Sequence, residues 1–175
     1  MTDKHELAAE GAERRAGTGV VVEPVGWVSS PRAQPLDDEW GDVISTITLD
    51  PARFDARALV GLADFSHVEV VYLFHRVEAS AVQMTARHPR GNAAWPQVGV
   101  FAQRAKGRPN RIGVSVCELL GVQGITLTLL ALDAIDGTPV LDVKPYMSEF
   151  AARGEVRQPA WSHELMAAYW ERARR

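Results

Sequence analysis

The sequence predicts a mainly β protein whose strands form an antiparallel barrel or a strongly curved sheet. About six segments have the β-branched, alternating composition that favours strands. These segments do not alternate with full-length helices, which disfavours a doubly wound α/β fold. One short helix in the first half of the chain and one helix near the C-terminus complete the predicted elements.

The first half of the chain contains three of the predicted strands. Residues 20–29 begin the fold as a strand interrupted by proline and glycine. Residues 43–49 alternate apolar and polar side chains, as a strand with one buried face does. Residues 50–61 open with an Asp-Pro pair and predict the short helix. Residues 66–77 are apolar on both faces and predict a central strand covered on both sides.

The second half begins with a long irregular connection at residues 84–97, a length that is usually functional or disordered. Residues 112–122 and 125–132 predict a hairpin through a glycine-containing turn. Residues 133–139 have the composition of a turn and lead into a strand at residues 140–143.

Composition limits the classes of function. The chain has 175 residues and a net charge of −3, so a protein that coats nucleic acid nonspecifically is excluded, and any RNA contact must come from a local basic patch. The single cysteine, Cys117, excludes an internal disulfide, and no Cys/His spacing predicts a metal site. No segment has the apolar length of a signal peptide or a membrane span, so we expect a cytoplasmic protein that is not bound to membranes.

A cationic loop lies between strand-like ends in residues 99–115. Four cations between two strands could bind a phosphate, a carboxylate or a nucleic-acid backbone, although charge alone favours a solvated hairpin tip. The cations are Arg104, Lys106, Arg108 and Arg111. Two further polar loops, at residues 87–92 and 133–138, could converge with it at one rim of a small barrel. No nucleotide-binding glycine motif, Walker lysine or nucleophile elbow is present, so no catalytic residue is assigned.

Two motifs carry a family resemblance. Residues 99–113 read G-V-F-A-x-R-x-x-x-R-P-N-x-I-G, and residues 132–146 read L-D-x-x-D-G-T-P-V-L-D-V-K-P-Y. With segments at residues 24–31, 61–67 and 87–92, these motifs resemble the TsaA-like family, which includes the tRNA methyltransferase TrmO.

The resemblance implies a closed antiparallel β-barrel that binds S-adenosylmethionine without a Rossmann fold and forms a homodimer. It also implies N6-methylation of a threonylcarbamoyl-modified adenosine in tRNA. Two alternatives stay open: a methyltransferase of the same fold with a small-molecule or other acceptor, and a non-catalytic barrel that binds a nucleotide or RNA. Titration with S-adenosylmethionine separates both methyltransferases from the binding module.

Motif position assigns roles to individual residues. The resemblance implies cofactor contacts at Arg87, Pro89, Phe101, Arg104, Asp133, Thr138 and Val140. It implies substrate contacts at Lys106, Arg108, Asn110, Arg111 and Lys144. In this interpretation the cationic loop faces the cofactor at its beginning and a polyanionic substrate further along.

The resemblance divides the chain into three parts, with a mobile tail at residues 1–19, a barrel domain at residues 20–148 and an extension with one helix at residues 149–175. The helix is expected to begin at Ser162 and to place apolar side chains on one face. This extension has no match in the family pattern, and Arg111 stands where the family commonly has proline. These departures point to an altered pocket rim and a changed methyl acceptor.

Overall fold

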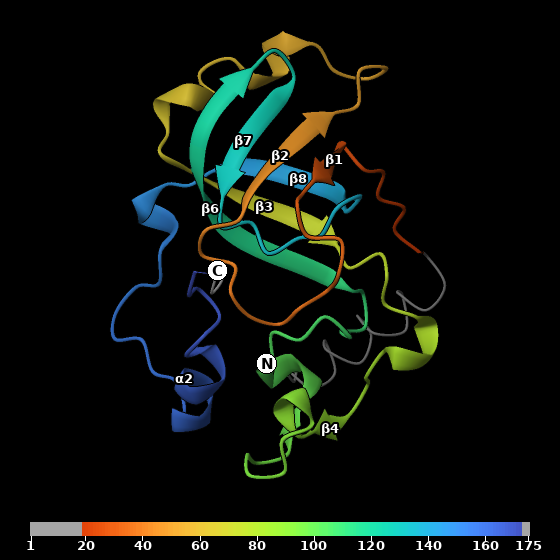
Figure 1. Cartoon of the computed structure of the whole chain (residues 1–175), viewed down its shortest axis with the longest axis vertical. Helices are drawn as coiled ribbons and strands as arrows, with labels where there is room; N and C mark the ends of the chain where they lie inside the picture. The colour runs from red at the N-terminus through yellow and green to blue at the C-terminus, as the bar shows by residue number, and fades with distance from the viewer. Residues whose placement is uncertain (1–18, 173–175) are drawn as a thin grey trace, which may run out of the picture.

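Six strands close into an antiparallel β-barrel in the computed structural model, which describes residues 19–172 (Figure 1). Around the barrel the strands follow the order β1-β2-β7-β6-β3-β8, and β8 pairs with β1 to close it. Their bounds are Gly26–Ser29 (β1), Ile44–Leu49 (β2), His67–Leu73 (β3), Ile112–Gln123 (β6), Thr126–Leu130 (β7) and Pro139–Pro145 (β8). The predicted mainly β barrel is confirmed.

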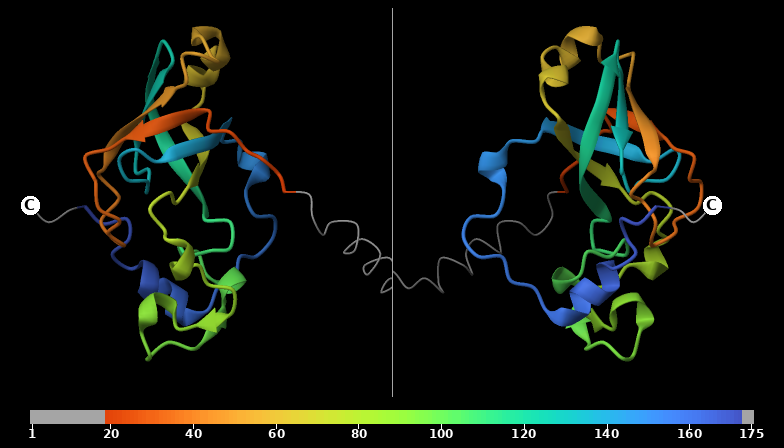
Figure 2. Two further views of the ribbon diagram at one scale, coloured as in Figure 1. Left: turned by 90° about the vertical axis from the view of Figure 1, so that its right-hand side faces the viewer. Right: turned by 60° about the vertical axis from the view of Figure 1, so that its left-hand side comes forward.

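The remaining elements lie outside the barrel wall. Two short strands, Ala86–Arg87 (β4) and Val98–Gly99 (β5), pair with each other. The 3₁₀ turns are Ala56–Leu59 (η1), Leu62–Asp64 (η2), Ala79–Ala81 (η3), Pro89–Gly91 (η4), Val100–Ala102 (η5) and Ser148–Phe150 (η6). Within residues 19–172 the one α-helix is Ala160–Met166 (α2). Figure 2 shows the barrel strands gathered at one end of the molecule, with α2 and the segment around β4 and β5 together at the other end.

Alternating burial explains why these segments form barrel strands. In β2, Ser45, Ile47 and Leu49 are buried, whereas the residues between them are half-buried or exposed. In β7, Leu127 and Leu129 are fully buried and face the same interior. Because successive side chains point to opposite faces, each strand places every second residue in one common core.

The predicted coverage of the third strand on both faces is wrong. β3 is paired along both edges, with β6 and β8, but burial alternates along it. Val68, Val70 and Tyr72 face the core, and the intervening side chains are only half-buried. A barrel wall has one interior face, so apolar residues on the outer face of β3 do not make it a doubly covered strand.

Both predicted helix starts are wrong, the first by five residues and the second by two. The first helix begins at Ala56, after the Asp55 side chain accepts a hydrogen bond from the Arg57 amide at 2.9 Å. Asp50 instead closes its own turn by accepting from Ala52. Both aspartates are suited to an N-cap position, and in the structure Asp55 is the one that caps the helix.

The C-terminal helix begins at Ala160, with Pro159 at its cap. The Ser162 hydroxyl donates back to the Pro159 carbonyl at 2.7 Å, so it lies inside the first turn and does not cap it. The helix ends at Met166, and Tyr169 follows in turns.

The cationic loop is not the tip of a hairpin. Val98–Gly99 pairs with β4, whereas Ile112 opens β6 and pairs with β3, so the two ends of the loop belong to different ladders. The connection at residues 84–97 is correspondingly less irregular than predicted, because it contains β4 and η4. The predicted hairpin formed by the next two segments is confirmed as β6 and β7.

The predicted N-terminal tail, except for its last residue, lies outside the described residues. Gly19 has no regular structure. No helix in residues 19–172 has the length and hydropathy needed to cross a lipid bilayer. The division into three parts remains a prediction.

Leu127→Ala should lower the free energy of unfolding by about 2–5 kcal/mol, because the removed side chain is fully buried and leaves a cavity in the barrel core. Leu120→Ala is the matched control, since Leu120 is 45% exposed on β6. Urea denaturation followed by circular dichroism checks this. Equal losses for the two variants would contradict the assignment of the core face.

Candidate functional site

A cavity of about 1670 Å³ lies at one end of the barrel. Its wall combines strand ends with the polar loops at residues 87–92, 104–111 and 133–138, all three of which contribute side chains. The structure therefore brings together loops that are far apart in the sequence. A fourth part of the wall comes from residues 158–170. A concave site of this size with convergent polar groups is the usual form of a small-molecule site.

Nine predicted site residues line this cavity. They are Arg87, Pro89, Phe101, Arg104, Lys106, Arg108, Asn110, Asp133 and Thr138. Most of the residues from both predicted groups, cofactor and substrate, thus share one wall. Their individual roles remain predictions.

Three predicted residues lie away from the cavity wall. Val140 is fully buried in the barrel core, where it has no access to a ligand. The Arg111 guanidinium donates to the Val77 carbonyl at 2.9 Å. Lys144 forms an ion pair with Asp142 on β8. The structure gives these side chains structural contacts and does not bring them to the cavity.

Asp133 accepts hydrogen bonds from three hydroxyl groups. Tyr72 on β3 donates to its Oδ1 atom at 2.8 Å, and Ser115 on β6 donates to the same atom. Tyr169, which follows α2, donates to Oδ2. A carboxylate offers about four acceptor positions, so about one remains on Oδ2 for a ligand donor.

The environment keeps these phenols protonated. Burial raises the pKa of Tyr72 well above its ordinary value, and the negative charge of Asp133 adds to this shift. Burial, followed by the same carboxylate, also raises the pKa of Tyr169. Both groups therefore stay hydrogen-bond donors throughout the neutral and moderately alkaline range. The nearby Cys117 thiol is an inert core group, because burial raises its pKa to about 12.

A glycine in the signature motif makes room for this cluster. A Cβ atom at Gly113 would lie 2.4 Å from ring atoms of Tyr72. Any side chain at this position would displace the Tyr72 ring, whose hydroxyl reaches Asp133. The Ile-Gly pair that closes the motif is thus explained by close packing of β6 on the Tyr72 ring.

Two nitrogen atoms on the cavity residues are buried and lack hydrogen-bond partners among the described residues. They are Nε of Arg87 and Nδ1 of His75. The Arg87 main chain is held by Gln103, whose side-chain amide donates to the Arg87 carbonyl at 3.3 Å. A buried donor without a partner is costly, so the Arg87 guanidinium fits an anionic ligand group such as a carboxylate. Burial lowers the pKa of His75, which favours its neutral form.

The cations of the loop also shape the wall itself. Arg104 donates to the Val114 carbonyl at 2.6 Å, and Arg108 donates to the Val100 carbonyl at 3.2 Å. Lys106 forms an ion pair with Asp37 at 3.0 Å and remains 44% exposed. These contacts exclude the interpretation of a freely solvated tip, because each of these side chains ties the loop to another segment.

The cavity wall also contains polar residues that were not predicted from the sequence, namely Tyr72, His75, Gln103 and Ser115. Each is a polar residue within a largely apolar stretch, and this contrast is the sequence signal that could have identified them. Tyr169 carried no such signal, because an aromatic residue near an amphipathic helix is most often plain core. The structure places the C-terminal segment on the cavity.

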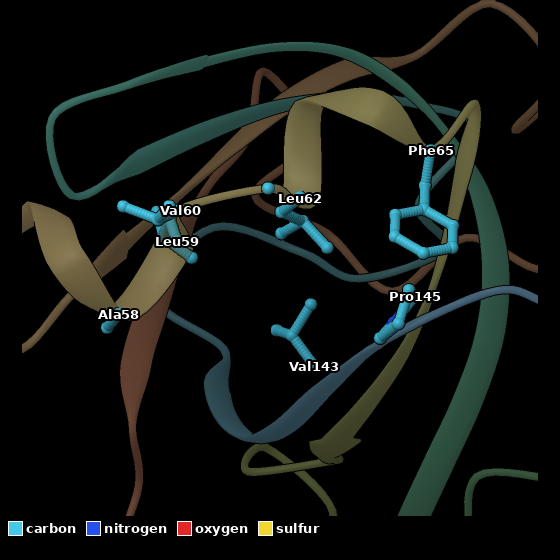
Figure 3. Close-up of a pocket in the computed structure, with 8 residues that line it drawn as sticks. Ala58, Leu59, Val60, Leu62, Phe65, Val143 and Pro145 are labelled. Atoms are coloured by element: carbon cyan, nitrogen blue, oxygen red, sulfur yellow. The ribbon is translucent and has the colours of Figure 1, made fainter.

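A second, smaller pocket lies between the η1–η2 segment and β8, with a volume of about 340 Å³. Figure 3 shows Leu62, Phe65, Val143 and Pro145 grouped around it. Its lining contains no ionisable side chain, so it offers no group for acid–base or electrostatic catalysis. Among residues 19–172, no cluster of His, Cys, Asp and Glu could hold a metal ion.

Comparison with protein families identifies a match over most of the chain. A sequence model of the tRNA-methyltransferase O N-terminal domain matches residues 29–152. The match includes the barrel strands from β2 to β8 and the polar loops, and it begins at the last residue of β1. It ends before the C-terminal segment that lines the cavity.

Two curated relatives illustrate the range of the match. The human "tRNA (adenine(37)-N6)-methyltransferase" is 34% identical over 148 residues, which is 80% of this chain and 33% of the human protein. A Methanothermobacter thermautotrophicus protein named "Probable S-adenosyl-L-methionine-binding protein" is 36% identical over 137 residues, which is 76% of this chain and 94% of that protein. The chain thus spans a third of the first relative and nearly all of the second.

Solved structures agree with the sequence relatives. A crystal structure of TrmO from Pseudomonas aeruginosa superposes with a TM-score of 0.65 at 32% sequence identity. The superposition covers 80% of this chain and 61% of that chain. The likeness therefore extends to the fold as well as the motifs.

Tyr169→Phe should leave the rise in phenolate absorbance between about pH 9 and 11 unchanged, since Tyr169 with its raised pKa does not ionise in that range. Ultraviolet titration of the native protein measures it, with circular dichroism at each pH as the check on folding. A smaller absorbance rise in Tyr169→Phe than in the wild type would show that Tyr169 ionises as an ordinary phenol and does not donate its hydrogen bond to Asp133.

Proposed function

This chain belongs to the family of the tRNA-methyltransferase O N-terminal domain, and on that premise we propose that it is an S-adenosylmethionine-dependent methyltransferase. Its proposed substrate is a threonylcarbamoyl-modified adenosine in tRNA, methylated at N6. The observation that carries the proposal is the large cavity, whose wall contains both Arg87, with a guanidinium nitrogen that lacks a partner, and Asp133, a carboxylate without an ion-pair partner among the described residues.

The residues on the wall fit the cofactor. S-adenosylmethionine, when bound, supplies an activated methyl group on a positively charged sulfur. Arg87 on the cavity wall would bind its carboxylate through the guanidinium group. Asp133 would accept a hydrogen bond from a hydroxyl or amino group of the ligand at Oδ2. The 78% exposed ring of Phe101 offers a face for an adenine base.

The main contribution of this chain to the reaction is to position the cofactor and the methyl acceptor. Methyl transfer requires the acceptor nitrogen and the methyl group to be held in line and close together. The ordered loop and the buried strand ends supply a rigid wall for that purpose, because Arg104 and Arg108 tie the loop to strand and turn carbonyls.

A tRNA substrate is supported by the local charge of the wall. The chain carries a net charge of −3, yet four basic residues of the cavity wall lie in or beside the cationic loop and on η4, at Arg90, Arg104, Lys106 and Arg108. Lys106 is exposed enough to exchange its surface ion pair with Asp37 for a phosphate. A tRNA substrate would place the protein in the cytoplasm, and the homodimer implied by the family resemblance belongs to the same proposal.

A different methyl acceptor is the second candidate. The C-terminal segment lines the cavity but lies outside the matched residues 29–152. Part of the wall therefore lies outside the matched family domain, and the contacts that a wall makes with an acceptor decide which acceptor reacts. The test is mass analysis of nucleosides after incubating the purified protein with S-adenosylmethionine and tRNA that carries threonylcarbamoyl-adenosine. Added methyl on that nucleoside supports the tRNA assignment, and cofactor binding without it supports the second candidate.

Arg87→Ala should weaken S-adenosylmethionine binding by roughly tenfold or more, because a charge-assisted hydrogen bond to the cofactor is lost. Isothermal titration calorimetry measures the affinity. The matched control is Arg57→Ala, since Arg57 is exposed on η1 and pairs with Asp55. If both variants bind like the wild type, Arg87 does not bind the cofactor. If the wild type itself fails to bind, the methyltransferase proposal is wrong.

Lys106→Ala should lower tRNA affinity and reduce the slope of log affinity against log salt by about one, as expected when one phosphate contact disappears. Fluorescence anisotropy with labelled tRNA at several salt concentrations gives the slope. Arg57→Ala again serves as the control, because it removes a surface cation away from the cavity. A slope that is unchanged in Lys106→Ala would remove this residue from the RNA interface.

A further inference from the structure

The C-terminal segment, residues 158–170, forms one side of the cavity. Gln158, Pro159, Trp161, Ser162, Leu165, Met166, Tyr169 and Trp170 all belong to the wall. Figures 1 and 2 show α2 at the same end of the barrel as β4 and the loops beside it. The segment thus faces the cationic loop across the ligand space, with mainly apolar and aromatic side chains.

The segment is attached by backbone hydrogen bonds at its end. The amides of Glu39 and Trp40 donate to the carbonyls of Ala168 and Tyr169, at 3.1 and 2.8 Å. The Gly41 amide also donates, to the Glu171 carbonyl at 3.3 Å. Three consecutive amides before β2 therefore hold the end of the C-terminal segment in place, although the two stretches form no strand pair.

Gly41 shows that this approach is close. A Cβ atom there would lie 1.9 Å from the Trp170 carbonyl oxygen, a contact that no side chain can make. The segment can therefore lie where it does only because residue 41 has no side chain. Beside it, Tyr169 packs against the buried cluster of Trp40, Val43 and Ile135.

The side chains add two directed contacts. The Tyr169 hydroxyl donates to Asp133, and the Trp95 indole donates to Glu164 on α2 at 2.8 Å. The first contact reaches the carboxylate in the middle of the wall. The second joins α2 to the loop that precedes β5.

We propose that Tyr169 is a positioning residue that orients the Asp133 carboxylate for the cofactor, so that residues 158–170 complete the cofactor site of this chain. The proposal rests on the proposed function and adds to it a part of the site that the matched family domain does not contain. Tyr72 and Ser115 hold Oδ1. Among the described residues, Tyr169 is the one that donates a hydrogen bond to Oδ2. Without this hydrogen bond, Oδ2 and the adjoining part of the wall are no longer held in place.

A double-mutant cycle tests whether Tyr169 acts through Asp133. Tyr169→Phe keeps the ring and removes one hydroxyl, and it should weaken S-adenosylmethionine binding by roughly tenfold in calorimetry. In an Asp133→Asn background the same change should alter the affinity by less than about twofold. Tyr146→Phe is the matched control, because Tyr146 lies on the His67 side of the barrel and not on the cavity.

Gly41→Ala tests the segment without replacing any side chain of the cavity wall. The new methyl group must displace the Trp170 carbonyl, so the affinity for S-adenosylmethionine should fall while the barrel stays folded. Gly121→Ala is its control, since a Cβ at Gly121 meets no atom within 4 Å. Hydrogen exchange should also show that cofactor protects residues 158–170 in the wild type.

The outcomes separate this proposal from the one on which it rests. Normal binding by Tyr169→Phe, or losses that simply add in the double variant, would overturn the positioning role of Tyr169. Undiminished binding by Gly41→Ala, with no protection of the segment, would remove residues 158–170 from the site. In both cases the wild type still binds S-adenosylmethionine. Absence of binding by the wild type would instead overturn the proposed function, and this inference with it.

Discussion

The arrangement of the cavity depends on the hydrogen bonds that satisfy Asp133. A carboxylate partly removed from water is costly unless it accepts hydrogen bonds, and three hydroxyls from separate segments donate to the half-buried Asp133. Among residues 19–172, no Lys or Arg lies within ion-pair distance of it. Neutral donors therefore join β3, β6 and the C-terminal segment at one point and leave a negative charge on the wall. The hydroxyl cluster is both a structural junction and an electrostatic feature.

The opposite part of the wall has the complementary character. Arg104 and Arg108 donate to backbone carbonyls and keep their positive charge, whereas Lys106 pairs with the surface carboxylate of Asp37. A ligand that carries both a cationic sulfur and a carboxylate suits a cavity with both signs of charge. The shape of the site and its electrostatics thus lead to the same class of ligand.

Local patterns predicted much of the fold. The alternation in β2 and the glycine turn between β6 and β7 act over a few residues, so the sequence contains enough information to place them. The predictions from sequence were wrong where two residues could both cap a helix, or where the pairing partners of a segment are distant in the chain. Asp50 and Asp55 both suit a cap, and only packing decides between them. The loop after β5 has strand-like ends, but its pairing partners lie in different ladders.

The sequence by itself determined the strand content, the one-sided burial of most strands and the motifs that mark the family. It also named nine residues of the cavity wall. Only the tertiary structure decided that Tyr169 reaches Asp133 and that residues 158–170 form part of the wall. The physical reason is separation along the chain. Contacts between residues 36 or 61 positions apart arise from barrel closure and backbone docking, which no local periodicity encodes.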